Sequence, residues 1–573
     1  MEGLLACESA ERAPEVASLS QAQAYCLQRR ESAAPALRRL LDTLEPGGPQ
    51  GAVQVGYTVT LQLLALYHRT PKGWAIDPVQ LDTWMRLITE VQRPVVVYLS
   101  AGHFDSTGPL TEELLADPRN LMALRDGQPP QLGYFGYRIA PYTLRTDADI
   151  PVNRYRYAAL EAVAKRLLAL PEATRKRIVA VTLAGELHHL FPDFESGMGR
   201  HQDVRVTDYR PESVADFRRW LAREYGSVDA YARATGLPWQ SFDEVPAPSR
   251  DIRKEPLKGF AEHYDAYADG TLPLSGWLWD PQGKVQRLQL HLDGQPLADV
   301  PRGLHRLDVY RAVDEIRNPN TGFRYDLDYR NLAPGRHRAQ VIAHTAEGLF
   351  EVAQTEFVVM ERDQRPPRAG SPAATSAKPL ARLRGVRAWM DLPQPPLDLY
   401  YNPVARDWNR FRSHQAAAFL AEFHRRARAA GLPAAWLFSH QIVPRANGTW
   451  NPQLFAMDDT LRGDAAWNHG LNLYGGMTDS DWVQAYFQAQ GIRGYGVPEF
   501  HPQQWKEPGA ALRALQRHQK AGARFVSPYY FTVVPPRFKG GAEHGVNRME
   551  LTPTNPKDGS DQFYRAIVDF ARQ

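Results

Sequence analysis

Residues 176–186 read KRIVAVTLAGE, and this stretch is the strongest indication of the fold class. From Ile178 to Ala184 every residue except Thr182 is apolar, a pattern typical of a strand buried on both faces of a parallel sheet. The run ends on a carboxylate, Glu186. The segment PESVADFRRWLAREYG at 211–226 then places apolar residues on one side at helical spacing. A buried strand followed by an amphipathic helix predicts an α/β fold.

The same strand-then-helix unit recurs along most of the chain. The clearest repeat is RPVVVYLS at 93–100, which follows a helix opened by Asp77 as N-cap and Pro78 in the first turn. Counting 176–186, eight candidate strands are present, the others covering 51–60, 93–100, 132–140, 433–440, 469–476, 492–499 and 523–531. Eight strands that are mostly followed by helices predict a (β/α)₈ TIM barrel.

One segment departs from this rhythm. From 271 to 361 the apolar residues alternate with period two, and turn signals such as Asp293-Gly294 separate the runs. This pattern predicts an all-β, immunoglobulin-like sandwich inserted in the barrel. The stretch 362–380 is rich in Pro, Ala and Ser and is expected to be a linker. We therefore expect a helical segment at 1–50 and a barrel split into 51–270 and 381–573.

Size and charge exclude several classes of function. With 573 residues the chain is too long for a single ordinary core. Lys and Arg number 68 against 64 for Asp and Glu, a net charge of +4, and no dense basic run is present. A nucleic-acid partner is therefore not expected. No run of about 18 apolar residues exists, so no membrane span is expected. The oligomeric state is left open.

The N-terminal sequence and the cysteines provide evidence on the cellular compartment of the protein. The opening MEGLLACESAERAPEV lacks a basic region followed by a long apolar region, so it does not predict a signal peptide. We expect a periplasmic or extracellular protein whose leader is absent from this sequence. Cys7 and Cys26 are the only cysteines. They form one disulfide in an oxidising compartment or remain free thiols, and both alternatives stay open.

Two of the predicted strands end on a glutamate, Glu186 and Glu499. If these are the fourth and seventh strands of the barrel, both carboxylates face its catalytic mouth. Pro498 and Pro502 restrict the backbone around Glu499. Paired carboxylates suit glycoside hydrolysis, in which one donates a proton to the leaving oxygen and the other attacks carbon or activates water.

These strand-end glutamates resemble those of clan A of the glycoside hydrolases. The segment YRPESVADFRRWLAREYGSVDAYARATG at 209–236 is also similar to the one after strand four in family 42 β-galactosidases. The resemblance implies a retaining glycoside hydrolase or transglycosylase acting on a bacterial oligo- or polysaccharide without a cofactor. It implies Glu186 as acid/base and Glu499 as nucleophile. Gly185 stands where the clan usually has Asn, so the contact to the sugar 2-hydroxyl must come from elsewhere or be absent.

Other functions remain open at this point. The residues AGEL at 184–187 also resemble the acid motif of β-amylases, which are inverting enzymes. A non-catalytic carbohydrate-binding or exopolysaccharide-assembly protein on a barrel scaffold is the main alternative, and a metal-dependent hydrolase is a third. The spacing of His188, His189, Asp193 and His201 fits no common zinc motif, so no metal site is predicted.

Further side chains are expected to line the mouth and bind substrate. By the resemblance, Tyr474 matches the tyrosine that hydrogen-bonds the nucleophile. Position after a strand favours substrate contact for His103, Asp105, His188, His440 and Gln441. Four aromatic residues are suited to stacking on sugar rings, with core packing as the alternative for each: Trp450, Trp505, Tyr529 and Tyr530.

Overall fold

The computed structural model describes residues 7–48, 51–101, 108–130, 132–134, 137–189, 205–361, 380–391, 397–533 and 548–573. The predicted site residues His103 and Asp105 lie outside the described residues, as do Asp193 and His201. Nearly all of the predicted linker also falls outside this part of the chain.

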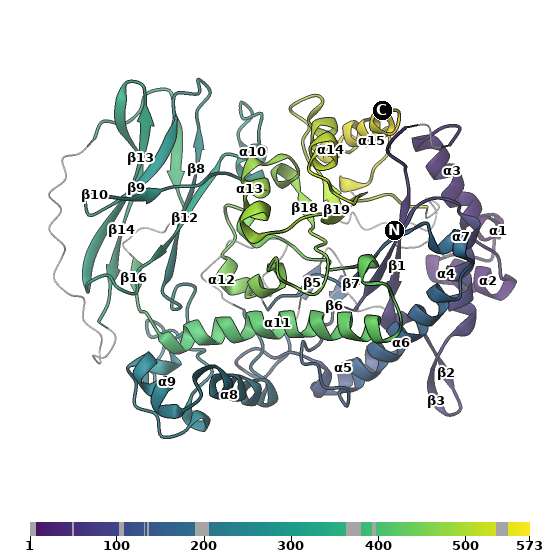
Figure 1. Ribbon diagram of the computed structural model, residues 1–573, viewed down its shortest axis with the longest axis horizontal. Helices are drawn as coiled ribbons and strands as arrows, with labels where there is room; N and C mark the ends of the chain where they lie inside the picture. The colour runs from purple at the N-terminus through teal and green to yellow at the C-terminus, as the bar shows by residue number, and fades with distance from the viewer. Residues whose placement is uncertain are drawn as a thin grey trace.

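Two parallel sheets form the centre of the α/β part (Figure 1), with strand orders β1-β4-β7-β17 and β18-β19-β20. Isolated parallel bridges pair Gln441 with Leu471 and Gly470 with Gly496, which carries backbone pairing from one sheet towards the other. The strands are β1 Tyr57–Gln62, β4 Val95–Ser100, β7 Ile178–Ala184, β17 Leu437–Phe438, β18 Leu473–Tyr474, β19 Gly496–His501 and β20 Phe525–Pro528.

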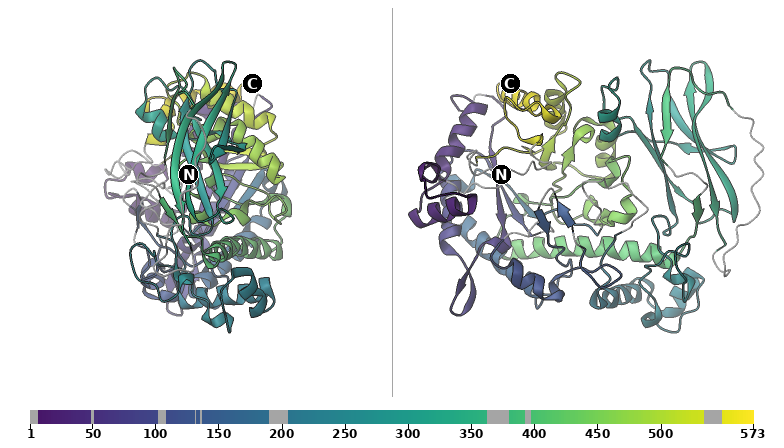
Figure 2. Two further views of the ribbon diagram at one scale, coloured as in Figure 1. Left: turned by 90° about the vertical axis from the view of Figure 1, so that its left-hand side faces the viewer. Right: turned by 180° about the vertical axis from the view of Figure 1, so that it is seen from behind.

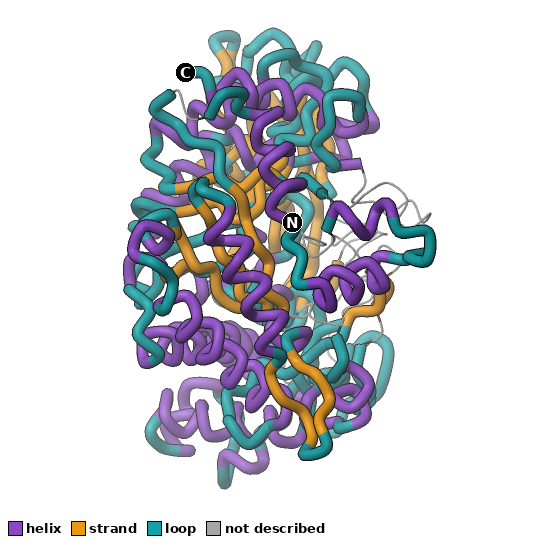
Figure 3. Tube along the Cα trace, turned by 90° about the vertical axis from the view of Figure 1, so that its right-hand side faces the viewer, coloured by secondary structure: helices purple, strands orange, loops and turns teal. Residues whose placement is uncertain are grey.

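The two outer strands of this parallel system meet through side chains. Thr58 on β1 donates its hydroxyl to Ser527 on β20 at 3.1 Å. Figure 3 shows the strands running through the middle of the α/β part with helices around them. The carboxyl ends of successive parallel strands therefore lie along one edge, where a site can be assembled.

The predicted third strand, 132–140, does not join either parallel sheet. Its residues form an antiparallel hairpin of β5 Leu132–Tyr134 and β6 Tyr137–Ile139, and β4 pairs directly with β7. Two three-residue strands that pair with each other satisfy their backbone groups locally. A second hairpin joins β2 Tyr67–Thr70 to β3 Gly73–Ile76. Among the described parallel strands, Glu186 thus follows the third and Glu499 lies in the sixth, rather than the fourth and seventh.

Helices cover the parallel strands because each has one apolar face. In α4 (Pro78–Glu90), Asp77 caps the backbone N–H groups of Val79 and Gln80, and Leu81 and Trp84 are among the residues buried. The long helix α11 runs along the molecule beneath the strands in Figures 1 and 2. Helix α11 spans Pro403–Ala429. The other helices of this part are α5 Thr111–Ala116, α6 Pro151–Leu168, α7 Glu172–Arg175, α8 Pro211–Tyr225, α9 Val228–Thr235, α12 Pro452–Phe455, α13 Asp481–Gln490, α14 Ala510–Lys520 and α15 Ser560–Ala571.

Within the described residues, no helix combines the length and the apolar character needed to cross a lipid bilayer.

The inserted module lies at one end of the molecule (Figures 1 and 2) and has two sheets, ordered β10-β9-β13-β14-β16 and β11-β12-β8-β15, with the short helix α10 between β11 and β12. Leu274 and Phe323 of one sheet and Leu290 and Val341 of the other belong to one buried cluster. The elements are β8 Thr271–Trp279, β9 Arg287–Leu292, β10 Gln295–Asp299, β11 Arg302–Leu304, α10 Leu307–Ala312, β12 Gly322–Asp328, β13 Gly335–Thr345, β14 Gly348–Val359, β15 Arg387–Met390 and β16 Leu397–Leu399.

The return to the α/β pattern comes later than the expected residue 381. Strand β15 pairs antiparallel with β8, and β16 pairs parallel with β14, so both extend the sandwich sheets. These strands have only three or four residues, too few to show a period-two pattern. The expected bounds of the module, 271–361, therefore leave out two of its strands.

The N-terminal segment forms a small separate core. Helices α1 Glu8–Arg12 and α2 Leu19–Arg29 are joined by a disulfide between Cys7 and Cys26, which settles the pairing left open by the sequence. Their buried residues form a cluster apart from the one that contains Leu37 and Leu41 of α3 (Ala34–Leu44). The disulfide therefore stabilises only this small N-terminal core.

Reduction of this disulfide is expected to loosen α1 while the remainder stays folded. The half-cystines are 19 residues apart, and a cross-link closing a loop of this size contributes about 3 kcal/mol. Trypsin should cut after Arg12 faster in the presence of dithiothreitol, as measured by mass spectrometry. The Cys7→Ser/Cys26→Ser protein should be cut fast with or without reductant. A large drop in the main melting temperature on reduction would contradict a purely local role.

Candidate active site at the strand ends

A tight turn at the end of β7 places Glu186. Ala184 has a φ of 65° and Gly185 a φ of 112°, both in the left-handed range. The Gly185 N–H donates to the Leu183 carbonyl at 2.8 Å, which closes a γ-turn. A γ-turn with positive φ at a non-glycine residue is strained. The surrounding structure must therefore hold this turn in place.

Gln441 holds the backbone on both sides of Glu186. Its Nε2 donates to the Gly185 carbonyl at 2.7 Å, and its Oε1 accepts from the Leu187 N–H at 3.2 Å. The side chain is fully buried. The sequence predicted a substrate contact for Gln441. In the structure both the oxygen and the nitrogen of its side-chain amide are hydrogen-bonded to the turn that carries Glu186. Gln441 is a positioning residue.

Gln441→Ala is expected to lower kcat by about 10–100-fold, because the turn would no longer hold Glu186 in position. The Gly185 carbonyl and the Leu187 N–H would be buried without their partner, which costs about 1–3 kcal/mol for each group. Gln441→Glu can accept from Leu187 but cannot donate to Gly185 when ionised, so it should recover only part of the loss. Steady-state kinetics with matched thermal melts would separate misplacement of Glu186 from unfolding. Full activity in Gln441→Ala would show that the turn holds itself.

Glu499 lies at an irregularity in β19. Val497 pairs with Val526 and Phe500 with Pro528, so β19 contains one residue more than β20 across this interval. Such a bulge redirects the side chains beside it. The side chain of Glu499 is 22% exposed, so its carboxylate is partly buried but accessible. The bulge and Pro498 together explain how a mid-strand glutamate reaches the site.

Two side chains hydrogen-bond the carboxylate of Glu499. His440 Nε2 lies 3.0 Å from Oε1, and the Tyr474 hydroxyl donates to Oε2. An ionised carboxylate only accepts, so Nε2 of His440 carries a proton and donates to Glu499, while its Nδ1 lies 3.3 Å from Thr182 Oγ1. The imidazole also stacks on Tyr98, with ring centres 4.0 Å apart. The predicted contact between Tyr474 and Glu499 is present.

The surroundings drive the two glutamates to opposite protonation states. Burial, followed by the charge of Glu499, raises the pKa of Glu186 to about 8 against an opposing hydrogen bond from Asn472. For Glu499, burial raises the pKa, but hydrogen bonds and charge from His440 and the hydrogen bond from Tyr474 together bring the pKa below its usual value. At neutral pH one carboxyl group is protonated and the other ionised, as acid and nucleophile or base require.

Asn472 was not predicted. It is 1% exposed, its Nδ2 donates to Glu186 Oε1 at 2.8 Å, and its backbone N–H donates to the Gln441 carbonyl at 2.7 Å. Its Oδ1 has no hydrogen-bond partner within the described residues. A signal was available, because Asn472 precedes Tyr474 by two residues and so projects from the same face of the strand. Asn472, which directly precedes β18, brings an amide to Glu186 from a part of the chain distant from β7.

The aromatic residues proposed for sugar stacking separate into two groups. Tyr529 lies edge-on to Tyr474 with ring centres 5.8 Å apart, and Tyr530 is its neighbour at 5.2 Å. Trp450 instead stacks on Phe455 at 5.1 Å, and Trp505 packs edge-on against Tyr310 of α10 at 4.8 Å. The two tyrosines lie beside the site, whereas the two tryptophans pack within the structure.

His188, also predicted to bind substrate, is 2% exposed and packs edge-on against Phe455 with ring centres 5.5 Å apart. The next residue, His189, is fully buried beside Thr207. Strand-end position alone did not distinguish such core histidines from His440.

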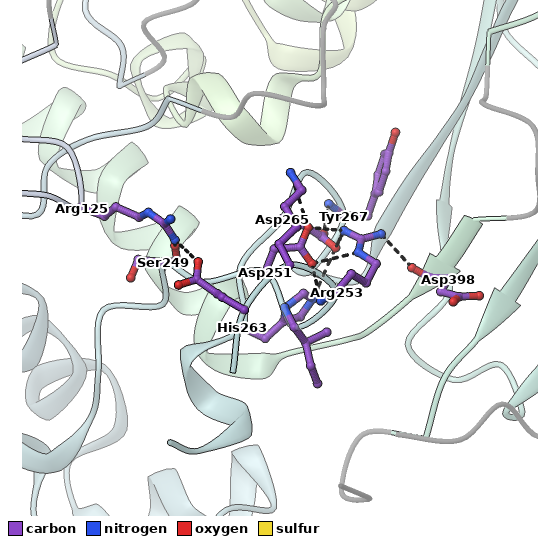
Figure 4. A network of polar contacts seen from close by, with 11 residues as sticks. Arg125, Ser249, Asp251, Arg253, His263, Asp265, Tyr267 and Asp398 are labelled. Carbon is purple, nitrogen blue, oxygen red and sulfur yellow. Dashed lines mark hydrogen bonds and ion pairs between the residues drawn. The ribbon is translucent and has the colours of Figure 1, made fainter. Parts of the chain in front are cut away.

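One acidic group outside this site has the composition of a metal centre (Figure 4). Ligand atoms of Asp251, His263 and Asp265 lie within 4.8 Å of one another. The guanidinium of Arg253 already contacts both carboxylates, donating to Asp251 at 2.9 and 3.1 Å, and reaches the Asp398 carbonyl at 3.2 Å. Arginine thus supplies the positive charge, and the network ties this loop to β16.

No protein-family model matches the sequence, and no curated protein matches it significantly. Similar solved structures include the β-galactosidase of Bacillus circulans sp. alkalophilus (12% identity, TM-score 0.41). Others are the β-amylase catalytic domain of Paenibacillus polymyxa (10%, 0.43) and the apo exo-carrageenase GH42 of Bacteroides ovatus (10%, 0.39). Each covers 90% of this chain, which spans 51%, 95% and 48% of theirs, respectively. The chain therefore spans about half the length of the first and third.

Proposed function

We propose that this protein is a retaining glycoside hydrolase or transglycosylase in which Glu186 is the acid/base and Glu499 the nucleophile. The observation that carries the proposal is the pair of glutamates that β7 and β19 bring together, Glu186 directly after β7 and Glu499 at the bulge of β19, in opposite electrostatic settings. Glu186 would protonate the leaving oxygen while Glu499 attacks the anomeric carbon. Water or an acceptor sugar would then release the glycosyl group, with Glu186 acting as base.

The hydrogen bonds of Glu499 favour a nucleophile over a base that activates water. Oxygens Oε1 and Oε2 each accept one hydrogen bond, from His440 and Tyr474 respectively. This fixes the carboxylate for attack on a single atom. Burial and the charge of Glu499 raise the pKa of the Tyr474 hydroxyl, so it remains a donor. An inverting reaction, which the AGEL motif keeps open, would release the opposite anomer.

The test is a screen of aryl glycosides and bacterial polysaccharides with the wild-type protein and the Glu499→Gln variant. Proton NMR of the first product anomer distinguishes retention from inversion before mutarotation. Binding of glycans without turnover, unaltered in Glu499→Gln, would support instead the carbohydrate-binding alternative.

The pH dependence of kcat/KM is expected to be bell-shaped, because the active form has Glu186 protonated and Glu499 ionised. Activity should fall above about pH 8 as Glu186 loses its proton, and at acid pH as Glu499 gains one. His440→Ala removes a donor to Glu499, so it should move the acid limb to higher pH and leave the alkaline limb in place. An alkaline limb that moves equally would contradict the assignment.

The finer architecture and the compartment belong to the same proposal. The bridges between the two parallel sheets and the contact of Thr58 with Ser527 support a barrel-like arrangement. The two-sheet insert supports an immunoglobulin-like module. The Cys7–Cys26 disulfide supports work in the periplasm or outside the cell, where such bonds persist.

A further inference from the structure

The inserted module contacts the two loops that follow the partners of Glu499, His440 and Tyr474. His305 follows β11 and is 4% exposed, and its Nδ1 accepts a hydrogen bond from the Gly476 N–H at 3.0 Å. Its backbone pairs with the loop after β17, donating to Ala446 and accepting from Gly448, both at 3.0 Å. One residue of the insert therefore touches two consecutive strand-end loops of the α/β part.

The turn that begins directly after Tyr474 is shaped around His305. Gly475 has a φ of 55°, and a Cβ added there would lie 2.2 Å from Cε1 of the imidazole. The ring thus packs against the backbone with no room for a side chain. Asn320, also from the insert, donates its Nδ2 to the Gly476 carbonyl at 2.9 Å. Both the N–H and the carbonyl of Gly476 are bound by the module.

A buried arginine of the insert holds the other loop. Arg324 on β12 is 6% exposed and donates to the carbonyls of Arg445, Asn447 and Trp450 at 3.1, 3.3 and 3.1 Å. Asp326 balances its charge at 3.2 Å. The guanidinium of Arg324 is buried, so its N–H groups would lack acceptors if the three loop carbonyls moved away. These hydrogen bonds therefore favour a single conformation of the loop.

We propose that the inserted module is a working part of the candidate active site, in which His305 is a positioning residue that keeps Tyr474 bonded to Glu499. The proposal rests on the function argued above and extends it to the insert. Both donors to Glu499, His440 and Tyr474, precede loops that the module binds. A module that served only to bind glycan at a distance would leave the chemistry of Glu499 unchanged.

The direct test is His305→Ala. We expect kcat/KM to fall about tenfold, the factor of one lost hydrogen bond of ordinary strength. The acid limb of the pH profile should move to higher pH, as in Tyr474→Phe but by less. In the Tyr474→Phe background the same change should have little further effect. His305→Asn should restore the profile, because Asn Oδ1 can accept from Gly476 where Nδ1 does.

His337→Ala is the matched control within the same module. His337 is also a buried histidine, 6% exposed, but its bonds to Asp293 at 2.7 Å and to the Ala333 carbonyl at 2.8 Å stay inside the sandwich. Its loss should lower the stability of the module and leave the pH profile unaltered. Should His305→Ala fold poorly, Asn320→Ala tests the same turn from the other side and should shift the acid limb in the same direction.

The readout can be made independent of glycosidase activity. The pKa of Glu499 is lowered in the folded protein, so its ionisation contributes stability above the unfolded pKa that is lost as pH falls through the folded value. Loss of the Tyr474 bond should shrink this contribution. If wild type cleaves no glycoside, the proposed function fails. The positioning role of His305 is then tested by the unfolding free energy alone. The difference in this free energy between neutral and acid pH should be smaller in His305→Ala than in wild type. It is overturned if His305→Ala matches His337→Ala in both readouts.

Discussion

Glu499→Ala should abolish turnover of every substrate, by a factor on the order of 10⁴ or more. In the proposed mechanism Glu499 forms the bond to the anomeric carbon, so substrates with good leaving groups should depend on it as much as natural glycosides do. Added azide can take its place on an activated β-glycoside and attack from the vacated side, giving a glycosyl azide of inverted configuration. Product analysis by NMR would detect that anomer.

Glu499→Gln is the matched variant for this experiment, because it keeps the size of the side chain and can still accept from Tyr474. It should be as inactive as Glu499→Ala towards natural substrates yet bind them with similar affinity, measured by calorimetry. Residual activity above one part in a hundred in either variant, with the protein folded, would place the nucleophile elsewhere.

Glu186→Ala should show an effect that depends on the leaving group. General acid catalysis contributes about 10²–10⁴-fold, so natural glycosides should lose about that factor. Dinitrophenyl glycosides, whose leaving group needs little protonation, should still form the glycosyl-enzyme rapidly. Release of that intermediate lacks its base and becomes slow, so a burst of dinitrophenol is expected in stopped-flow measurements.

Azide should accelerate turnover of Glu186→Ala, because an anion needs no base to attack the glycosyl-enzyme. The product is expected to be a glycosyl azide with the configuration of the substrate, opposite to that from Glu499→Ala. The alkaline limb of the pH profile should also disappear, since it reports loss of the Glu186 proton. Equal losses on all leaving groups, with the alkaline limb retained, would refute the acid/base role.

The amino-acid pattern predicted most of the strands and helices, and it placed Glu186 and Glu499 at two of the predicted strands. Apolar periodicity reports the buried face of an element directly, so β7, β19 and their helices were predictable. The change to period two marked the inserted sheets. Tyr474 was identified through the family resemblance, and its bond to Glu499 is present in the structure.

The pairing of polar side chains could not be predicted from the amino-acid pattern, because it depends on contacts between distant parts of the chain. Gln441 and Gly185 are 256 residues apart in sequence, and they meet because β17 lies beside β7. The same holds for Asn472 with Glu186, and for His305 with the turn after Tyr474. Local patterns show which way a side chain points but not which strand is its neighbour. The ring contacts of Trp450 and Trp505, the hairpin at 132–140 and the place of β15 and β16 depend on those neighbours, so long-range packing alone settled them.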